Sequence, residues 1–304
     1  AAAGKDKVAI CGYHGWHDWY LSANLADDQN LDRHLLPGLE TRGVPNNLRG
    51  TVLPFNYNCL EELELLVSQH DVGVIKMEVS RNERPKKGFL EKVRELASRE
   101  NIILIFDEST SGFRETFGGL HKKYGVEPDM AMFGKALGNG YAVTATIGRR
   151  EVMDATQSTF ISSTFWTERI GSVAGLKTLE VMEKTRSWEQ ITAKGTTIAG
   201  IWKRLAEKYG LPLEVFGLPA LIKFRFISQN NLGYKTLITQ EMLQKGFLAG
   251  NSVFVCTAHT PEILDAYEQA IDPVFGLIAE CEDGRDVEKL LNGPLCHAEF
   301  RRLN

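Results

Sequence analysis

The sequence predicts an α/β protein with a doubly wound, parallel sheet, followed by a smaller α+β region. The first observation is that short apolar runs alternate with amphipathic helical segments through the first half of the chain. The second is the run at 102–106, five consecutive apolar residues of β-branched and aromatic type. Such a run is typical of a strand that is buried on both faces of a parallel sheet.

Length and composition narrow the functional class. A chain of 304 residues with 43% hydrophobic residues can bury a large core. Its formal net charge of −4, with basic residues scattered along the chain, argues against nucleic-acid binding. No apolar run approaches the roughly 18 residues that a membrane-spanning helix needs, and the first residues do not resemble a signal peptide.

The cysteines indicate the compartment. Five cysteines, an odd number, share no CxxC spacing and suggest neither a disulfide framework nor a zinc site. We therefore expect a cytoplasmic protein that does not associate with membranes.

The first half of the chain follows the βα pattern. Residues 1–7 read as the end of a helix closed by Gly4, which leads us to expect that an N-terminal part is missing from this chain. The region 23–58 has little periodicity and several prolines, so we expect a long excursion with local turns. The expected regular elements are strand 8–11, helix 60–68, strand 72–77, helix 89–97 and strand 102–106.

The second half changes character near residue 185. We expect strands at 129–133 and 142–147, a loop at 158–168, and helices at 170–184, 191–209, 234–245 and from Thr260 and Pro261 onward, with strands at 221–227 and 252–256. In strand 221–227 the alternation places Ile222, Phe224 and Phe226 inward. The predicted domains are a large domain over 1–184 and a small domain over 185–304.

Asp107 and Lys135 form the first candidate site. Each follows a buried strand, and open α/β sheets bind their ligands at the carboxyl ends of the strands. A lysine partly removed from water is a nucleophile toward an aldehyde, and pyridoxal phosphate (PLP) is the commonest protein-bound aldehyde. That cofactor needs a carboxylate beside its ring nitrogen, which Asp107 can supply. Taken singly, a solvated lysine and a turn or capping aspartate are the alternatives.

The loop at 12–20 carries aromatic residues and two histidines. Tyr13 can cover a cofactor ring, and Thr164, in a second loop, can contact a phosphate. His14 and His17 have no further metal ligands nearby in the sequence, so we expect hydrogen-bonded histidines and no metal site.

Four motifs, in order, resemble one family. They are G-Y-H-G at 12–15, I-F-D-E-x-x-S-G-F-R at 105–114, P-D-x-x-x-F-G-K-A-L-G-N-G at 128–140 and S-T-F-W-T-E at 163–168. Together they resemble the class III PLP-dependent aminotransferases, in particular the branch similar to glutamate-1-semialdehyde 2,1-aminomutase. The resemblance implies fold type I, with a central, mainly parallel sheet, flanking helices and a smaller α+β C-terminal domain. It also implies a homodimer whose active sites are shared between subunits.

The resemblance assigns roles to individual residues. Lys135 matches the lysine that forms the internal aldimine and moves the proton between substrate carbons, and Asp107 matches the partner of the pyridine nitrogen. Tyr13 matches the aromatic residue on the cofactor ring, with His14 beside it. Thr164 matches the threonine that reaches the cofactor phosphate of the partner subunit.

Three departures from the family pattern stand out. Ser109 occupies the position of a β-branched apolar residue that packs on the other face of the ring, so the cofactor is expected to be held more loosely. Glu78, expected near substrate or cofactor oxygen atoms, is followed by Val79 where the family often has proline. The glycine- and serine-rich turn that holds the cofactor phosphate in the family precedes the Y-H-G loop, and this chain has no counterpart.

The leading hypothesis is an aminotransferase that moves an amino group from an amino donor to a keto or aldehyde acceptor, or the related intramolecular aminomutase. One alternative is a truncated or degenerate relative that dimerises and binds without catalysis. Another is a PLP-dependent decarboxylase or racemase of the same fold. Trp16 is a candidate substrate contact, with packing in a dimer interface as its alternative, and the substrate itself is not predicted.

Overall fold

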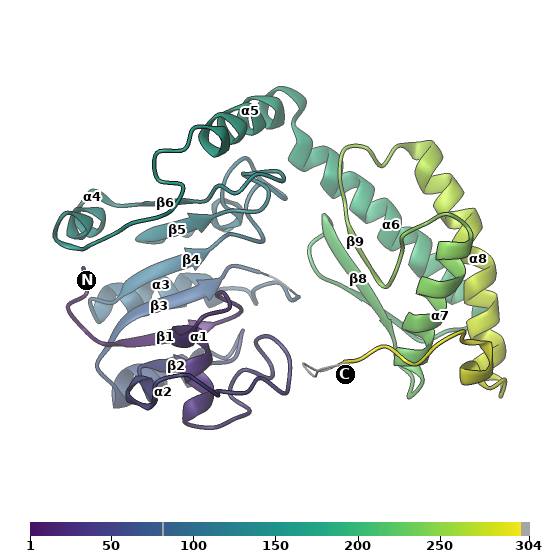
Figure 1. Ribbon diagram of the computed structural model, residues 1–304, viewed down its shortest axis with the longest axis horizontal. Helices are drawn as coiled ribbons and strands as arrows, with labels where there is room; N and C mark the ends of the chain where they lie inside the picture. Colours follow the sequence, from purple (N-terminus) through teal and green to yellow (C-terminus); the bar gives the residue numbers. More distant parts are fainter. Residues whose placement is uncertain (81, 299–304) are drawn as a thin grey trace. The chain divides into compact units, whose positions relative to one another are not determined.

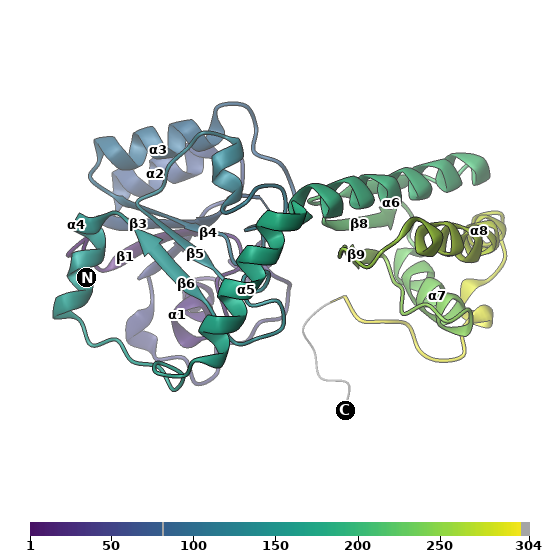
Figure 2. The ribbon, with the colours of Figure 1, turned by 90° about the horizontal axis from the view of Figure 1, so that it is seen from above.

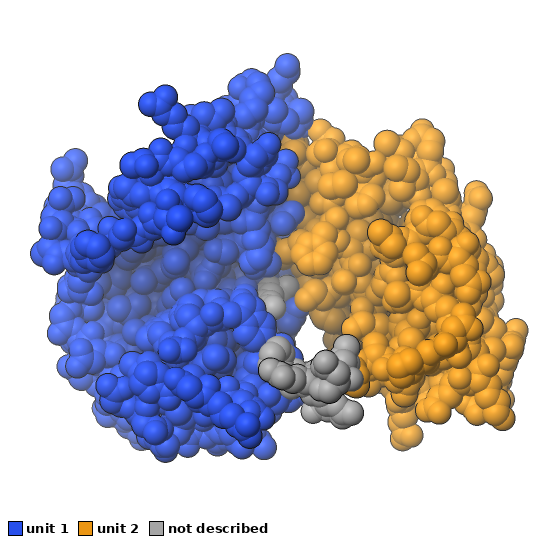
Figure 3. Space-filling view, viewed as in Figure 1, with its two compact units in different colours: residues 1–185, 299–304 blue, residues 186–298 orange. Residues whose placement is uncertain are grey.

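A computed structural model describes residues 1–80 and 82–298. The chain divides into two compact units, residues 1–185 and residues 186–298, which are coloured separately in Figure 3. The first unit ends at residue 185, one residue after the predicted end of the large domain. The roles of the two domains remain a prediction. Among the described residues, no helix combines the length and the hydrophobicity needed to cross a membrane.

The first unit is built on a six-stranded sheet in the order β2-β1-β3-β4-β5-β6 (Figure 1). Neighbouring strands run parallel from β2 to β5, and only β6 is antiparallel to its neighbour. The predicted mainly parallel sheet is therefore confirmed. The strands are β1 (Lys7–Cys11), β2 (Val52–Pro54), β3 (Val72–Glu78), β4 (Ile103–Asp107), β5 (Met130–Phe133) and β6 (Ala145–Gly148).

Helices cover both faces of this sheet. Figure 2 shows α2 and α3 side by side on one face, with α1 on the other. Helix α3 buries Phe89, Leu90, Val93, Leu96 and Ala97, the apolar stripe expected from the sequence. The helices of the unit are α1 (Asp18–Leu21), α2 (Leu60–Gln69), α3 (Phe89–Arg99), α4 (Arg150–Met153) and α5 (Ile170–Thr185), with 3-10 turns η1 (Ser22–Leu25), η2 (Asn46–Leu48), η3 (Leu120–Lys123) and η4 (Asp154–Ser158).

One strand of the sheet was not predicted. β2 lies inside the stretch 23–58, which we expected to be irregular. The strand has only three residues and ends in Pro54, which cannot donate a backbone hydrogen bond and normally signals a turn. It is an edge strand, the position where a sheet tolerates proline.

The second unit has a three-stranded antiparallel sheet in the order β7-β8-β9 and three long helices. Ile222, Phe224 and Phe226 of β8 are buried, as their alternation predicts, and they belong to one apolar core with side chains of all three helices. The elements are α6 (Ser187–Tyr209), β7 (Leu213–Phe216), β8 (Leu221–Phe226), α7 (Asn231–Gln244), β9 (Ser252–Phe254), α8 (Pro261–Glu282) and the turn η5 (Val287–Leu290). Thr260 caps α8 through its side chain, and Pro261 begins the helix, both as expected.

Candidate active site

The candidate site lies at the carboxyl edge of the parallel strands of the first unit. Glu78 is the last residue of β3 and pairs in register with Asp107, the last residue of β4. Asp107 pairs in turn with Met132 of β5, and Lys135 follows the end of that strand by two residues. The loop with Tyr13 and His14 begins directly after β1. Because these strands are parallel, the predicted acid, lysine and aromatic loop come to one edge of the sheet.

Asp107 is a buried, strongly stabilised carboxylate. Its Oδ2 accepts a hydrogen bond from His14 Nδ1 at 3.0 Å and lies 3.6 Å from Lys76 Nζ, while its Oδ1 accepts from the Ser109 backbone N–H at 3.2 Å. Burial by itself raises the pKa of Asp107, but these donors and the Lys76 charge outweigh burial and lower the pKa to about 2. Asp107 is therefore ionised throughout the physiological pH range.

His14 is a second buried residue of the site and donates a hydrogen bond to Asp107. Its side chain is buried, and burial lowers the pKa of the imidazole despite the hydrogen bond to Asp107; the charge of Lys76 lowers the pKa further. Because an ionised Asp107 can only accept, Nδ1 carries the proton of the neutral ring. The prediction that His14 is a hydrogen-bonded loop histidine agrees with this geometry.

Lys135 is exposed, in contrast to Asp107. Its φ of 37° lies in the left-handed region, which non-glycine residues rarely adopt and which concentrates at functional sites. Its Nζ donates a hydrogen bond to Thr110 Oγ1 at 2.9 Å. The amine is thus accessible to a ligand and tethered to the loop that follows Asp107.

Glu78 holds the aromatic loop in place. Its carboxylate is buried and accepts a hydrogen bond from the Tyr13 backbone N–H at 3.0 Å. Gly12, with a φ of 112°, permits this approach because a Cβ there would lie 2.5 Å from Glu78 Oε2. The sequence predicted Glu78 near substrate or cofactor oxygen atoms; in the structure its carboxylate binds the backbone of the loop.

The remaining predicted residues differ in how close they come to this cluster. The Tyr13 ring packs against Trp16 and Tyr20, with centroids 5.7 and 5.8 Å apart. Trp16 is 56% exposed, and Ser109 lies beside Asp107 through its backbone hydrogen bond. Thr164 lies apart, in the exposed loop before α5.

Sequence reasoning missed two residues of the site. Lys76 follows four residues without polar side chains in β3, and a lone cation inside this buried strand was the available signal. Thr110 follows the predicted Asp107 by three positions, and its hydroxyl could not be connected to Lys135 without the fold.

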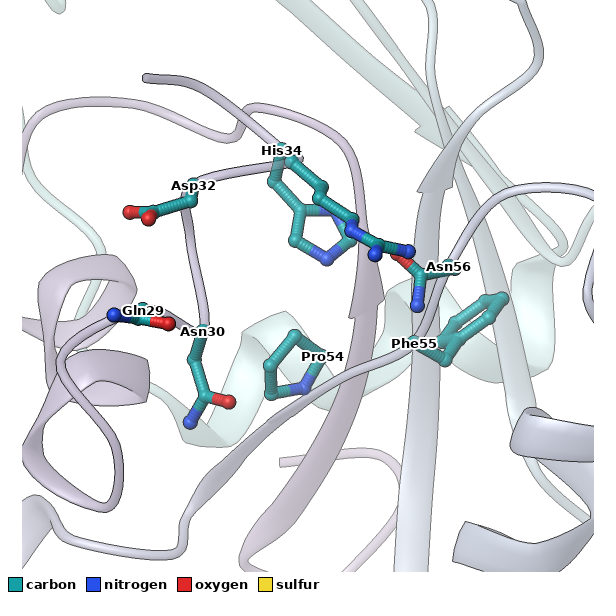
Figure 4. A pocket seen from close by; sticks show the side chains of 8 residues that line it. Gln29, Asn30, Asp32, His34, Pro54, Phe55 and Asn56 are labelled. Atoms are coloured by element: carbon teal, nitrogen blue, oxygen red, sulfur yellow. The ribbon is translucent and has the colours of Figure 1, made fainter. Parts of the chain in front are cut away.

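A polar pocket adjoins the start of the aromatic loop (Figure 4). It has a volume of about 280 Å³ and is lined by Gln29, Asn30, Asp32, Arg33, His34, Pro54, Phe55 and Asn56. His34 connects the pocket wall to the site, because its Nδ1 accepts a hydrogen bond from the Gly12 backbone N–H at 3.1 Å. Burial lowers the pKa of His34 to about 4, so the ring is neutral and able to accept this bond at pH 7.

This arrangement suits a ligand that carries both a carbonyl group and a protonated ring nitrogen. The exposed amine of Lys135 can attack a carbonyl carbon, and the ionised Asp107 can bind a cationic N–H. The hydrogen bonds that Asp107 receives fix its orientation before any ligand binds.

Comparison with known proteins identifies the family. The model of the class III aminotransferases matches residues 58–265. A 3-aminobutyryl-CoA aminotransferase of Cloacimonas acidaminovorans is 34% identical over 88% of this chain and 64% of its own length. A glutamate-1-semialdehyde 2,1-aminomutase of Methanocaldococcus jannaschii is 26% identical over 86% of this chain and 66% of its own length. The chain thus spans about two thirds of these curated relatives.

The fold agrees with this relationship. The FumI protein of Sphingopyxis sp. MTA144, solved in its PLP internal aldimine form, superposes with a TM-score of 0.81. The superposition covers 95% of this chain and 69% of that chain at 19% identity, and it shows that the two share the PLP-dependent transferase fold of type I. Sequence motifs, sheet topology and the family match agree, and the chain belongs to the class III aminotransferase family.

Proposed function

We propose that this protein is a PLP-dependent aminotransferase or intramolecular aminomutase. The observation that carries the proposal is the pairing of an exposed lysine with an ionised, buried aspartate at the ends of neighbouring strands. Lys135 is tethered at 2.9 Å to Thr110, and the pKa of Asp107 is about 2 because hydrogen bonds and the Lys76 charge outweigh its burial. Family membership supports the same reaction class.

The residues present fit PLP. Asp107 would hold the protonated ring nitrogen, Lys135 would bind the aldehyde carbon, and Tyr13 and Ser109 would line the two faces of the ring. When bound, PLP supplies a carbonyl group for amines and an electron sink for the carbanion formed on the substrate. The structure supports the fit through Oδ1 of Asp107, which accepts one hydrogen bond from Ser109 and retains a second lone pair.

The chain's own groups perform the proton transfer. In its neutral form Lys135 Nζ can take a proton from one substrate carbon and deliver it to another atom within reach. Thr110 Oγ1 keeps Nζ near this position between transfers. Asp107 stays ionised, so it would stabilise the positive charge of the protonated ring nitrogen of a bound cofactor.

The proposed substrates are an amino donor and a keto or aldehyde acceptor. The two relatives act, by their names, on 3-aminobutyryl-CoA and on glutamate 1-semialdehyde, which share an amino group on a short carbon chain. We place the protein in the cytoplasm, in keeping with its cysteine usage, and expect no role in nucleic-acid binding.

A homodimer with shared active sites completes the proposal. The loop before α5 and the outer side of α5 expose large apolar side chains: Phe160, Phe165, Trp166, Ile170, Val173 and Leu176. Contiguous apolar patches of this kind mark protein interfaces. Thr164 lies within this stretch, in keeping with the role that the family resemblance gives it, a contact to the cofactor phosphate of the partner subunit.

The proposal is tested by the covalent attachment of PLP to the full-length protein. We expect borohydride reduction to fix one cofactor per chain on the peptide that contains Lys135, and Lys135→Ala to abolish both the label and the visible absorption of the bound cofactor. Lys92→Ala changes an exposed lysine of α3 and should retain both. Labelling of Lys135→Ala equal to the wild type would contradict the proposal.

Shared sites are tested by mixing two inactive variants. Lys135→Ala and Thr164→Ala lose different halves of one composite site, so a hybrid dimer contains one site with both residues intact. We expect co-expression to restore roughly a quarter to a half of the amine-driven spectral change of the cofactor, since half of the sites in a hybrid are intact. No recovery in a verified hybrid dimer would overturn the sharing of sites.

A further inference from the structure

Lys76 is a charged residue in the middle of a parallel sheet. It lies on β3, with Ile10 of β1 and Ile105 of β4 as its neighbours in register. Its side chain is only 12% exposed. Lysine is almost never buried to this degree unless its charge has a partner, because desolvation of an ammonium group is costly.

The partner of Lys76 is the candidate cofactor aspartate. Lys76 Nζ lies 3.6 Å from Asp107 Oδ2, the same oxygen that accepts the hydrogen bond from His14 Nδ1. The ammonium group also lies 5.9 Å from the centroid of the Trp19 ring, a distance that allows a cation–π interaction. Two side chains from separate segments, His14 of the loop after β1 and Lys76 of β3, therefore meet at the Asp107 carboxylate.

We propose that Lys76 is a positioning residue of the reaction, whose ammonium group balances the Asp107 carboxylate and thereby keeps His14 a neutral hydrogen-bond donor. This inference rests on the proposed role of Asp107 as the partner of the cofactor nitrogen. Lys76 acts through Asp107 and His14, and no contact with substrate or cofactor is proposed for it.

The charges of the cluster support this role. With Lys76 present, Asp107 already has a cationic neighbour, and the cluster of Lys76, Asp107 and neutral His14 has no net charge. A proton on His14 would place a second cation beside Lys76 in a buried site, which Coulomb repulsion disfavours.

The hydrogen bonding of His14 points the same way. Within the described residues, the buried Nε2 has no hydrogen-bond partner. Burial is the strongest influence on this ring: it lowers the pKa of the imidazole, although the Asp107 carboxylate and the Lys76 backbone both favour the charged form. Nδ1, which donates to Asp107, needs no further proton.

Other titratable groups face His14 as well. Asp107 on β4 favours its charged form, while the charge of Lys76 on β3 disfavours it. Glu78 on β3 accepts a hydrogen bond from the backbone of the adjacent Tyr13, and His34, in the loop after η1, is neutral at pH 7 because burial lowers its pKa to about 4. Replacing Lys76 by a neutral residue should therefore leave the Asp107 carboxylate beside His14 without the opposing Lys76 charge, and should raise the pKa of the imidazole.

The reaction benefits because Asp107 keeps one charge environment as the pH changes. If His14 ionised near neutral pH, the electrostatic interaction between Asp107 and the cofactor nitrogen would change as the pH changed. With Lys76 in place, we expect no ionisation of His14 in the pH dependence of the cofactor spectrum between about pH 6 and 8.

The test measures the ionisation of His14 in the cofactor-free, full-length protein. Ring nitrogens of ¹⁵N-labelled histidine report protonation by NMR for wild type, Lys76→Met, Lys76→Arg and Lys92→Met. We expect wild-type His14 to stay neutral at pH 6, Lys76→Met to raise its pKa by about one unit or more, and Lys76→Arg to restore the wild-type titration. Lys92→Met, on the exposed face of α3, should leave the titration unchanged.

Two results would overturn the inference. One is a wild-type His14 that is protonated at neutral pH, which can be seen even if Lys76→Met does not fold. The other is a folded Lys76→Met protein with an unchanged His14 titration.

A second measurement separates this inference from the proposed function. In the cofactor-loaded protein, Lys76→Met should add an ionisation near neutral pH to the cofactor spectrum, and Lys76→Arg should not. If the wild type binds no PLP but His14 responds to Lys76, the proposed function fails while the electrostatic role of Lys76 stands.

Discussion

The two compact units bury different kinds of side chain. Each of the buried Asp, Glu, His, Asn and Ser side chains found among the described residues lies in the first unit. His14, Glu78 and Asp107 belong to the candidate site, and Glu108, Ser111 and His121 form a second buried polar cluster. The core of the second unit consists of aliphatic and aromatic side chains, with aromatic contacts among Trp202, Phe224, Phe226 and Phe275.

The first unit buries the polar groups of the candidate site, whereas the second unit buries the apolar groups that stabilise it. Burying a charge costs free energy unless hydrogen bonds and a partner compensate, so the first unit carries polar clusters that an apolar core would avoid. Glu108 illustrates the compensation, since its carboxylate accepts from the backbone and Nδ1 of His121, each at 2.9 Å, and from the Ser111 hydroxyl. The second unit gains its stability from apolar burial.

The largest effect on this comparison should come from Phe224→Ala. Phe224 is fully buried, and its ring centroid lies 4.5 Å from that of Trp202. The variant loses apolar burial and leaves a cavity, so we expect the free energy of unfolding of the second unit to fall by about 3–5 kcal/mol. Urea unfolding followed by fluorescence of Trp202 measures this change.

The matched control for that variant lies on the same sheet. Phe254 of β9 is 68% exposed, so Phe254→Ala should change the free energy of unfolding far less. Equal losses in the two variants would mean that the apolar core of the second unit does not dominate its stability.

A smaller effect is expected from acidification of the first unit. Burial lowers the pKa of His34 from 6.5 to about 4 in the folded state. The unfolded chain therefore binds a proton first as the pH falls. Above pH 6.5 His34 is neutral in both states, so it does not change the free energy of unfolding with pH. Between about pH 6.5 and 4 the free energy of unfolding falls, by up to roughly 3–4 kcal/mol.

His34→Gln should flatten this acid dependence, because glutamine does not titrate and its oxygen can still accept from the Gly12 N–H. The free energy of unfolding, measured from pH 7 to 4, should fall less steeply for this variant than for the wild type. His297→Gln, which changes an exposed histidine, is the control. If the free energy of unfolding of His34→Gln falls with pH as steeply as that of the wild type, another group causes the acid sensitivity. His14 is then the next group to test.

The sequence by itself predicted most of the regular elements and the candidate residues of the site. Apolar runs predicted β1, β3, β4 and β5, because strands buried on both faces admit few polar residues. Asp107 and Lys135 could be named because each follows such a run, and parallel strands bring their carboxyl ends to one edge. β2 escaped prediction, since three residues that end in proline carry too little periodicity.

Only the tertiary structure decided how the site residues are partnered. Lys76 and Asp107 are 31 positions apart, and their 3.6 Å contact depends on the register between β3 and β4. The contact from His14 to Asp107 and that from Lys135 to Thr110 likewise join separate segments. Periodicity and composition describe local structure, whereas charge state follows from distances between segments. The residue types of the candidate site could therefore be predicted from the sequence, whereas their ionisation states could be inferred only from the three-dimensional structure.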